Sequence, residues 1–179
     1  MATKRMAGIL RVGIIADTHG VLHDAVPALF ANVDRILHAG DVGGAHVLRA
    51  LRELAPVTHV DGNNDDATGE DVVRLIIEGM RVLLTHILPR PSRVGAHVAA
   101  SLRKSAADLV VYGHSHLPHN ERVGAITYFN PASAGPRRFD YPTSVGLLEK
   151  RGDAWKVMHV ALDERSVEAL KKYLGVRRP

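Results

Sequence analysis

Three short apolar runs, each followed at once by polar residues, constrain the fold of this 179-residue chain more than any other feature. The runs cover residues 10–16, 35–39 and 57–60. Continuous apolar runs of this length are typical of strands that are buried on both faces of a parallel sheet. Helical patterns over residues 21–32 and 45–54 separate them, which predicts a strand-helix-strand-helix-strand unit with right-handed crossovers.

A different pattern follows in the second part of the chain. Residues 72–77 and 81–85 flank Glu78 and Gly79 in the manner of a β-hairpin. The remaining predicted elements are a helix over 94–104, strands over 109–112 and 125–129, a hairpin of strands 145–149 and 155–160, and a last helix that Asp163 caps and that ends near Gly175. Parallel and hairpin segments together predict two sheets, or one split sheet, packed between helices. We find no repeat or linker and expect one domain over residues 1–179.

The composition limits the kinds of site that the chain can build. Cysteine is absent, which excludes disulfides, thiolate zinc sites and cysteine nucleophiles, so any metal must be held by His, Asp, Glu or Asn. A reducing cytoplasm is the expected location. Arg11 interrupts the first apolar run, which argues against a secretory signal, and no stretch approaches the ~20 apolar residues of a membrane span. We therefore expect no membrane partner.

The charge of the chain favours anionic partners. The formal net charge is +4 and the sequence pI is about 9.6, which suits phosphates or nucleic acid. The basic residues gather mainly near the ends, in Lys4-Arg5, Lys171-Lys172 and Arg177-Arg178, and no basic run is interleaved with aromatic residues. This distribution argues against dedicated nucleic-acid binding. Assembly into a homo-oligomer stays open.

Five polar motifs come directly after strand-like segments. They are Asp17-Thr18-His19, Gly40-Asp41, Gly62-Asn63-Asn64-Asp65, Thr85-His86 and Gly113-His114-Ser115-His116. The ends of parallel strands converge on one side of a sheet, so these side chains can share one site. Their common placement carries more weight than any single motif, because each motif also has a simpler explanation.

The first three motifs illustrate these alternatives. Asp17 and His19, two apart in an extended segment, point the same way toward a cation, but the triplet also suits a turn or a helix cap. Asp41 follows a glycine, as in many turns, yet its two oxygens can bridge cations at the ~3.5–4 Å spacing of two-metal catalysis. Asn63 offers a neutral oxygen ligand within a segment that resembles an ordinary loop.

The histidine motifs predict the kind of metal. His86 taken alone suits a core histidine bonded to the backbone. His114 and His116, two apart at a strand end, are the most specific signal for a metal, with a surface turn as the alternative. His23 and His119 are weaker candidates near the site. Nitrogen and oxygen donors together suit Mn, Fe, Zn, Ni or Co better than Ca or Mg alone.

In this order, the motifs resemble the calcineurin-like metallophosphoesterase superfamily, whose pattern is Asp-x-His, Gly-Asp, Gly-Asn, a later His and Gly-His-x-His. The segments Asn130-Pro131-Ala132-Ser133 and Pro136-Arg137-Arg138 and the chain length narrow the resemblance to the small YfcE-type phosphodiesterase branch, which also contains a retromer subunit. The resemblance extends from about Val12 to the hairpin that contains Trp155. It implies a four-layer αββα sandwich of two mixed sheets flanked by helices, with the site at the sheet edges.

The resemblance also implies two divalent metal ions, with manganese as the expected metal and Fe, Zn, Ni or Co as alternatives. One ion would be held by Asp17, His19, Asp41 and His116, and the other by Asp41, Asn63, His86 and His114. Asp41 would then bridge the two ions.

Three residues depart from the family pattern. Asn64 stands where many larger relatives have a histidine that acts as general acid, so protonation of the leaving group is left without an assigned residue. Ile87 replaces the usual glycine after the motif histidine, and we expect it to reshape the loop at the second ion. Ala132 replaces a glycine, a change that we expect to be mild.

The implied reaction is hydrolysis of a small phosphodiester. Two ions lower the pKa of a bridging water, and the resulting hydroxide attacks phosphorus in line with the leaving oxygen. We expect Asn64 to hydrogen-bond the substrate and Arg137 or Arg138, preferably Arg138, to contact a non-bridging oxygen; solvent exposure is the alternative for both arginines. A phosphomonoesterase, and a protein-interaction scaffold of the retromer-subunit type, stay open as other functions. A nuclease of long polymers is disfavoured, because the chain shows no nucleic-acid-binding stripe.

Overall fold

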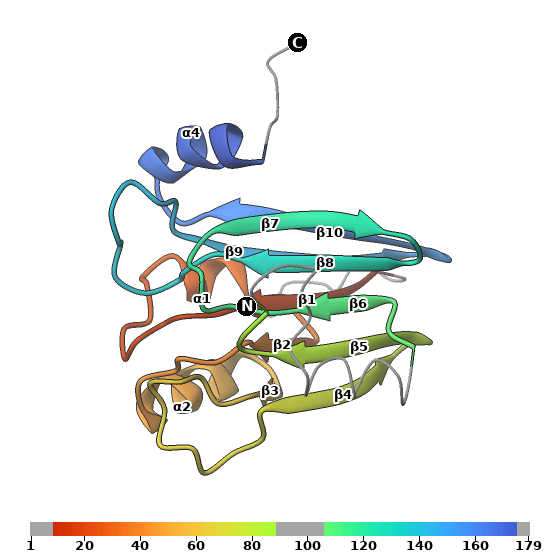
Figure 1. Ribbon diagram of the computed structural model, residues 1–179, viewed down its shortest axis with the longest axis horizontal. Coiled ribbons are helices and arrows are strands. Elements are labelled where there is room, and N and C mark those ends of the chain that lie inside the picture. Colours follow the sequence, from red (N-terminus) through yellow and green to blue (C-terminus); the bar gives the residue numbers. More distant parts are fainter. Residues whose placement is uncertain (1–8, 89–105, 175–179) are drawn as a thin grey trace.

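Two mixed five-stranded sheets form the centre of the molecule, and the computed structural model describes residues 9–88 and 106–174 (Figure 1). The strands of the first sheet are β1 (Ile9–Ile15), β2 (Arg35–His38), β3 (Val57–His59), β9 (Ser144–Arg151) and β10 (Ala154–Ala161). Those of the second are β4 (Val72–Ile77), β5 (Met80–Thr85), β6 (Leu109–Val111), β7 (Pro118–Val123) and β8 (Ile126–Pro131). The described helices are α1 (Val26–Leu29), α2 (Ala45–Leu54) and α4 (Glu164–Tyr173).

Each sheet contains three neighbouring parallel strands together with antiparallel pairs. The first sheet runs β10-β9-β1-β2-β3, and β1, β2 and β3 are parallel, as the initial apolar runs predicted. The second runs β4-β5-β6-β8-β7, with β5, β6 and β8 parallel. The predicted hairpins β4-β5 and β9-β10 are both confirmed. The chain thus forms two mixed sheets with helices, as expected.

The apolar runs are explained by burial on both faces of the first sheet. Along β1, Val12 and Ile14 point into the core between the sheets, whereas Ile15 packs with Phe30 in a second cluster beneath the helices. All four side chains are fully buried. Since burying an aliphatic side chain contributes roughly 1.5–3 kcal/mol, a strand with two buried faces accommodates few polar residues.

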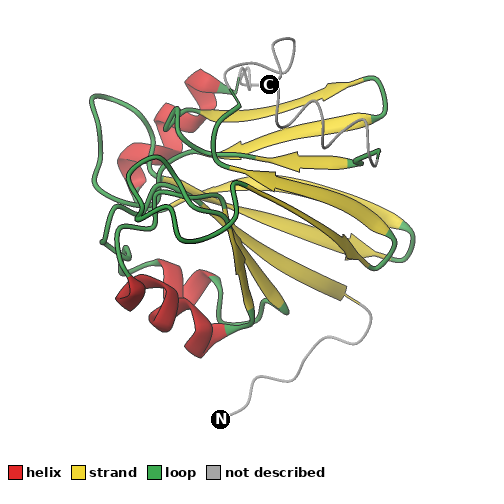
Figure 2. Cartoon of the chain, turned by 60° about the horizontal axis from the view of Figure 1, so that its bottom comes forward, coloured by secondary structure: helices red, strands yellow, loops and turns green. Residues whose placement is uncertain are grey.

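Helices cover the outer face of the first sheet, where α1 and α2 pack beneath β1 to β3 (Figure 2). The outer face of the second sheet carries its own apolar cluster, which includes Leu83, Val110 and Tyr112. The helix predicted over residues 94–104 lies outside the described residues, as does Gly175 at the predicted end of α4. Among the described helices, none combines the length and apolar character needed to cross a bilayer.

Two predictions about local structure were wrong. The helix expected over residues 21–32 is limited to Val26–Leu29, because Gly20 donates its backbone N–H to the carbonyl of Val42 and Val21 donates to Thr18. These bonds tie the preceding residues to the neighbouring loop. Strand β7 was missed because it is a polar edge strand whose residues after His119 are exposed, so it lacks an apolar run.

Candidate metal centre

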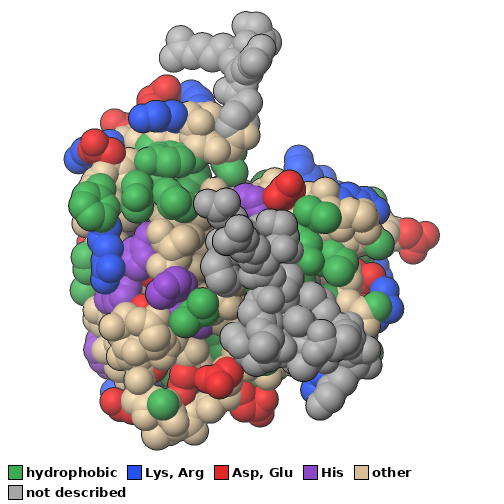
Figure 3. Space-filling view, viewed as in Figure 1, with side chains coloured by type: hydrophobic (Ala, Val, Ile, Leu, Met, Phe, Trp, Pro, Cys, Tyr) green, Lys and Arg blue, Asp and Glu red, His purple; other side chains and the backbone are tan. Residues whose placement is uncertain are grey.

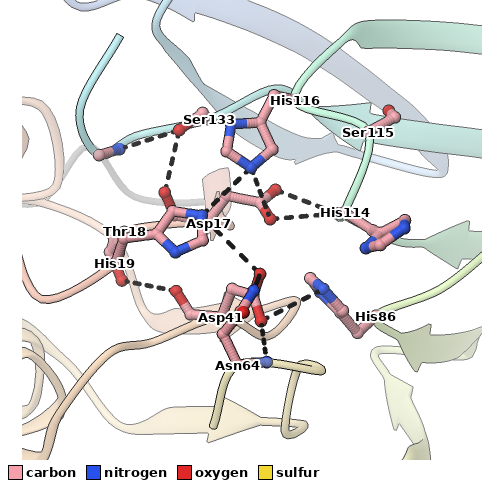
Figure 4. Close-up of polar contacts among 12 residues, drawn as sticks. Asp17, Thr18, His19, Asp41, Asn64, His86, His114, Ser115, His116 and Ser133 are labelled. Carbon is pink, nitrogen blue, oxygen red and sulfur yellow. Dashed lines mark hydrogen bonds and ion pairs between the residues drawn. The ribbon is translucent and has the colours of Figure 1, made fainter. Parts of the chain in front are cut away.

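The seven predicted ligand side chains lie together at one end of the two sheets; Figure 4 labels six of them, and the seventh, Asn63, contacts His86 and His114. Three loops of the first sheet supply Asp17 and His19 after β1, Asp41 after β2 and Asn63 after β3. Two loops of the second sheet supply His86 after β5 and both His114 and His116 after β6. The structure therefore brings together every residue that the motifs singled out as a ligand.

One group of donors is formed by Asp17, His19 and His116. The Nε2 atoms of His19 and His116 are 3.1 Å apart, and His116 Nε2 is 3.5 Å from Asp17 Oδ1. The ligand atoms of these three residues all lie within 4.8 Å of one another. Asp17 is fully buried and His116 nearly so, which gives a compact cluster with one carboxylate and two imidazoles.

A second group surrounds the amide oxygen of Asn63. This oxygen is 3.1 Å from His86 Nε2 and 2.8 Å from His114 Nδ1. His86 donates its Nδ1–H to the carbonyl oxygen of Ala39 at 2.7 Å, because that oxygen can only accept. Nε2 of His86 faces the site, 3.1 Å from Asn63 Oδ1 and 3.5 Å from Asp41 Oδ1.

Asp41 lies between the two groups. Its Oδ2 is 3.8 Å from His19 Nε2, and its Oδ1 is 3.5 Å from His86 Nε2. Asn64 fixes the carboxylate, because its backbone N–H donates to Oδ1 at 2.9 Å and its side-chain amide donates to Oδ2 at 2.7 Å. Asp17 also lies close, since Asp17, Asp41 and His86 form a second set of ligand atoms within 4.8 Å of one another.

The backbone at the site is strained. Five of the seven ligand residues have a positive φ, a region that residues with a Cβ rarely adopt: Asp17 (φ 53°), His19 (47°), Asp41 (52°), His114 (67°) and His116 (58°). Such conformations cost free energy and persist where the surrounding structure imposes them, as in functional sites. The strain agrees with a site whose side chains are held in place for a ligand.

Two glycines allow the loops to approach one another. Gly40 has φ 85°, and a Cβ on it would lie 2.6 Å from Nδ1 of His86. A Cβ on Gly62 would collide with the carboxylate and the backbone nitrogen of Asp41. Larger residues at either position would push the loops apart.

Two residues outside the proposed ligand set, Asp65 and Ser133, hold the loops of the site through hydrogen bonds. The sequence motifs did not predict this role. Asp65 accepts backbone N–H bonds from Val42 (3.1 Å), Gly43 (2.9 Å) and Gly62 (2.8 Å) and so joins the loops after β2 and β3. Ser133 donates its hydroxyl to the carbonyl of Asp17 at 2.9 Å. Both residues lie within polar segments of the sequence, but the sequence does not indicate which backbone groups they bond.

His38 is a further buried polar residue behind the site. Its Nε2 lies 2.9 Å from the hydroxyl of Thr18, which in turn donates to the carbonyl of Val42 at 2.8 Å. Burial lowers the pKa of His38 to about 3, so the ring is neutral near pH 7. The sequence shows that His38 ends an apolar strand, but it does not predict the hydrogen bond to Thr18.

The two carboxylates of the site have opposite pKa shifts. Burial raises the pKa of Asp17 to about 7, and the nearby charge of Asp41 adds to that shift, although His86 opposes it. Burial opposes ionisation of Asp41 as well, but hydrogen bonds from His86 and Asn64 outweigh it and hold the pKa of Asp41 below its usual value. Among described residues no Lys or Arg bonds to Asp17, so its buried carboxylate suits a cation bound beside it.

Most histidines of the site are kept neutral. Burial lowers the pKa of His19 and His114, and burial followed by the positive charge of Arg138 lowers the pKa of His116 to about 4. A neutral imidazole has the lone pair that a metal requires. His86 differs, because hydrogen bonds and nearby carboxylates raise its pKa against the effect of burial. The donor set, with its ionised and neutral groups, therefore fits divalent cations.

The two adjacent arginines have different environments. Arg137 donates to both carboxylate oxygens of Asp163, at 2.8 and 2.7 Å, to Ser166 and to the carbonyl of Tyr141. Its guanidinium is therefore committed to the structure. Arg138 is exposed, and its charge reaches His116. Only Arg138 of the pair is available to an anion at the site.

The weaker candidates and the departures from the family pattern are also located. The ring of His119 bonds the hydroxyl of Tyr112 at 2.6 Å and Glu121 at 3.1 Å, away from the ligand residues. His23 caps the backbone N–H of Ala25. Ile87 is partly exposed and lines a cavity of about 320 Å³, which adjoins the ligand residues His86 and Asn63.

Comparisons with known proteins agree with this geometry. Residues 10–153 match the family described as the calcineurin-like phosphoesterase superfamily domain. A probable metallophosphoesterase of Methanothermobacter thermautotrophicus is 33% identical over 150 residues, which cover 79% of this chain and 87% of that protein. The phosphodiesterase YfcE of Escherichia coli K12 is 31% identical over 135 residues, 70% of this chain and 68% of that protein.

Solved structures give the same fold. The structure of YfcE from E. coli superposes with a TM-score of 0.63 at 26% identity and covers 86% of this chain and all of that one. Vps29 of Entamoeba histolytica, solved with Zn²⁺, superposes with a TM-score of 0.64 at 23% identity over the same shares of both chains. At that identity the second similarity concerns the fold alone.

Proposed function

This chain belongs to the calcineurin-like phosphoesterase superfamily, and from that premise we propose that it is a phosphodiesterase that binds two divalent cations and hydrolyses small phosphodiesters. The observation that carries the proposal is the convergence of seven donor side chains from two sheets around Asp41. A phosphoesterase activity is supported by the relatives, and a phosphodiesterase by the name of the E. coli protein.

We assign four donors to each cation, with Asp41 common to both. The first set is Asp17, His19, Asp41 and His116, and the second is Asp41, Asn63, His86 and His114. The position of the Asp41 carboxylate, with one oxygen toward His19 and the other toward His86, supports this division. Each carboxylate oxygen keeps a lone pair beyond the bond that it accepts from Asn64.

Two cations held by these residues would supply Lewis acidity, which would neutralise charge on the phosphoryl oxygens and lower the pKa of water. The chain's own residues orient the reacting groups. Asn64 holds Asp41 through two hydrogen bonds, so its amide nitrogen acts on the carboxylate; a contact between Asn64 and substrate stays a prediction. The exposed guanidinium of Arg138 contacts a non-bridging phosphate oxygen, a charge-assisted bond that strengthens as charge develops.

The donors suggest which metals fill the site. Four imidazoles and three oxygen-donor side chains suit borderline divalent ions, and we propose Mn²⁺, with Fe, Zn, Ni and Co as alternatives.

Two other functions compete with this proposal. A phosphomonoesterase uses the same ligands, and differs only in the charge of the ester that it accepts. A protein-interaction scaffold of the Vps29 type would not require a complete ligand set, whereas all seven donors are present here and five of them adopt strained backbone conformations. The complete and strained set favours the enzyme.

One experiment separates these functions. The purified protein is stripped with a chelator, restored with Mn²⁺, Ni²⁺, Zn²⁺ or Fe²⁺, and assayed with bis(4-nitrophenyl) phosphate and 4-nitrophenyl phosphate. We expect metal-dependent hydrolysis that favours the diester. His119→Ala, which removes a histidine outside the proposed ligands, should retain this activity, and His86→Ala should lower it by about 10²-fold. No hydrolysis with any metal in a folded protein would contradict an enzymatic function.

A further inference from the structure

The segment between β8 and β9 ends in a turn whose two sides are tied to the start of α4. We call residues 137–141 the Arg-Phe turn. Tyr141 donates its N–H to the carbonyl of Arg138 at 3.2 Å, and Arg137 donates to the carbonyl of Tyr141 and to Asp163. Asp140 pairs with Arg165 at 2.6 Å. The side chains of Arg138 and Phe139 are left at the tip of an anchored turn.

Phe139 combines two energetically unfavourable features, an exposed apolar ring and a left-handed backbone conformation. Its side chain is 82% exposed, the highest value among the exposed large hydrophobic residues that the structure describes. Its φ is 52°, in the left-handed region that a residue with a Cβ rarely adopts. The strained backbone and the exposed apolar ring both cost free energy in the unliganded protein, and binding of a ligand to the ring offsets the second cost.

The Arg-Phe turn lies beside the metal centre. The segment that leads into it is bonded to Asp17, since Ser133 donates its hydroxyl and Gly135 its N–H to the carbonyl of Asp17. Arg138 follows three residues later. The charge of Arg138 acts on Asp17, His19 and His116, which places this residue near the ligands, and hydrophobic and histidine side chains share the face drawn in Figure 3.

Phe139 begins a row of rings. Its ring is 5.5 Å from that of Tyr141, which is 5.9 Å from the ring of Tyr173 on α4. The ring planes are inclined by 57° and 86° to one another, so the three rings form an aromatic patch beginning next to Arg138 in the chain, and Phe139 offers its own face to a ligand. A ligand that matches both features has a negative charge and, next to it, a ring.

We propose that Phe139 stacks against an aromatic or heteroaromatic ring of the substrate while Arg138 contacts the phosphate, so that the enzyme prefers phosphodiesters of aryl alcohols or nucleosides. The inference rests on the proposed phosphodiesterase function. Phenylalanine has no polar atom, so it recognises the flat face of a ring and is tolerant of its substituents. The ring acts as a specificity residue, and Arg137 positions it through the turn.

Binding of non-hydrolysable ligands tests the inference apart from catalysis. Phenylphosphonate and methylphosphonate differ only in the ring, and their dissociation constants for the Mn²⁺-loaded protein are measured by calorimetry. Because stacking on an aromatic side chain typically changes affinity by about tenfold, we expect the native protein to prefer phenylphosphonate by about tenfold. Phe139→Ala should abolish that preference, and Phe139→Tyr should keep it. Ile76→Ala is the matched control, since it removes another exposed apolar side chain, on β4.

The same proteins are assayed with bis(4-nitrophenyl) phosphate. Phe139→Ala is expected to lower kcat/KM about tenfold, mainly through KM. Equal affinity of the native protein for the two phosphonates, or an unchanged ratio in Phe139→Ala, would overturn the role of Phe139 while leaving the hydrolase intact. A change of oligomeric state in Phe139→Ala without a change in ligand affinity would also overturn it. Absence of hydrolysis by the native protein would instead overturn the proposed function.

Discussion

The two sheets contribute chemically different halves of the candidate metal centre. Loops of the first sheet supply both carboxylates, Asp17 and Asp41, together with Asn63 and His19. Loops of the second sheet supply imidazoles alone to this set: His86, His114 and His116. The acidic half and the basic half meet only when the sheets pack.

The difference shows where the electrostatic cost of the site lies. Asp17 and Asp41 repel each other on the same sheet, and burial together with this repulsion raises the pKa of Asp17. The second sheet contributes imidazole rings that are mostly neutral, because burial lowers the pKa of His114 and His116. Cations between the halves would compensate the carboxylates, so their binding should stabilise the packing of the two sheets as well as catalysis.

The largest effect is expected when the shared carboxylate of the acidic half is changed. Asp41→Asn preserves a carbonyl oxygen for the N–H of Asn64, so the protein should fold, but it removes the charge common to both proposed sites. Loss of metal-derived charge stabilisation should lower kcat/KM by about 10³-fold. Elemental analysis after dialysis should find neither ion. If Asp17→Asn rather than Asp41→Asn removed both ions, Asp17 would be the bridge.

Substitution of a histidine in the basic half should remove one metal ion, whereas substitution of Asp41 in the acidic half should remove both. His116→Ala and His86→Ala each remove a ring assigned to a single ion, so each variant should retain about one metal per chain and lose about 10²-fold in kcat. Metal content and kinetics measured on the same samples test this. Loss of both ions from either variant would mean that the two sets of ligands are not separate.

The segment between β8 and β9, which connects the second sheet to the first, contains two neighbouring arginines with different proposed roles: Arg138 in substrate binding and Arg137 in stability. Arg138→Ala should lower kcat/KM by roughly 10- to 100-fold with little change in the free energy of unfolding, because its side chain is exposed. Arg137→Ala should lower the free energy of unfolding by about 1–3 kcal/mol, because it removes the positively charged partner of Asp163. Urea unfolding and steady-state kinetics distinguish them; equal behaviour of the two variants would contradict the assignment of Arg138 to the substrate.

Asp163 shows what happens to a carboxylate when the chain itself supplies the cation. Burial opposes its ionisation, but hydrogen bonds from Ser166, Thr143 and Arg137 outweigh burial and lower the pKa of Asp163 to about 2, the opposite of Asp17. The folded pKa lies below the unfolded one, so this contribution is complete above about pH 4 and is lost as the pH falls toward 2.

The stability difference between the native protein and Asp163→Asn should follow this titration. Asparagine also caps helices, so the cap of α4 is retained. Since Asp163 is partly exposed, we expect a difference on the order of 1 kcal/mol at pH 5 that shrinks toward pH 2. Urea unfolding across this range measures it. A difference that stays constant with pH would exclude an ionised Asp163 as its cause.

The smallest effect is expected at Ala132, in the same connection. Its φ is 68°, where glycine is favoured, so Ala132→Gly relieves a strain of about 1–2 kcal/mol. The greater freedom of glycine in the unfolded chain and the loss of a buried methyl group offset that gain. The free energy of unfolding should therefore change by less than about 1 kcal/mol in thermal or urea unfolding. A larger loss would show that the methyl group supports the loop beside Asp17.

The strands were predictable where burial on both faces enforced an apolar run, as in β1 and β2. The polar edge strand β7 and the four-residue length of α1 were not, because neither depends on a local apolar pattern. For the site, the motifs identified the ligand residues. They did not distinguish Arg137 from Arg138 or reveal Asp65 as the residue that joins two loops, because those roles depend on partners distant in the sequence.

The sequence by itself determined which donors the chain offers and that they follow strand ends, because local hydrophobic patterning sets strand positions and residue chemistry sets the choice of metal. Only the tertiary structure decided how these donors meet. The packing of the sheets sets Asp41 between His19 and His86, gives Asp17 and Asp163 opposite pKa shifts, and leaves Phe139 exposed beside the site. These properties arise from desolvation and from contacts between residues distant in the sequence, which no short segment of sequence contains.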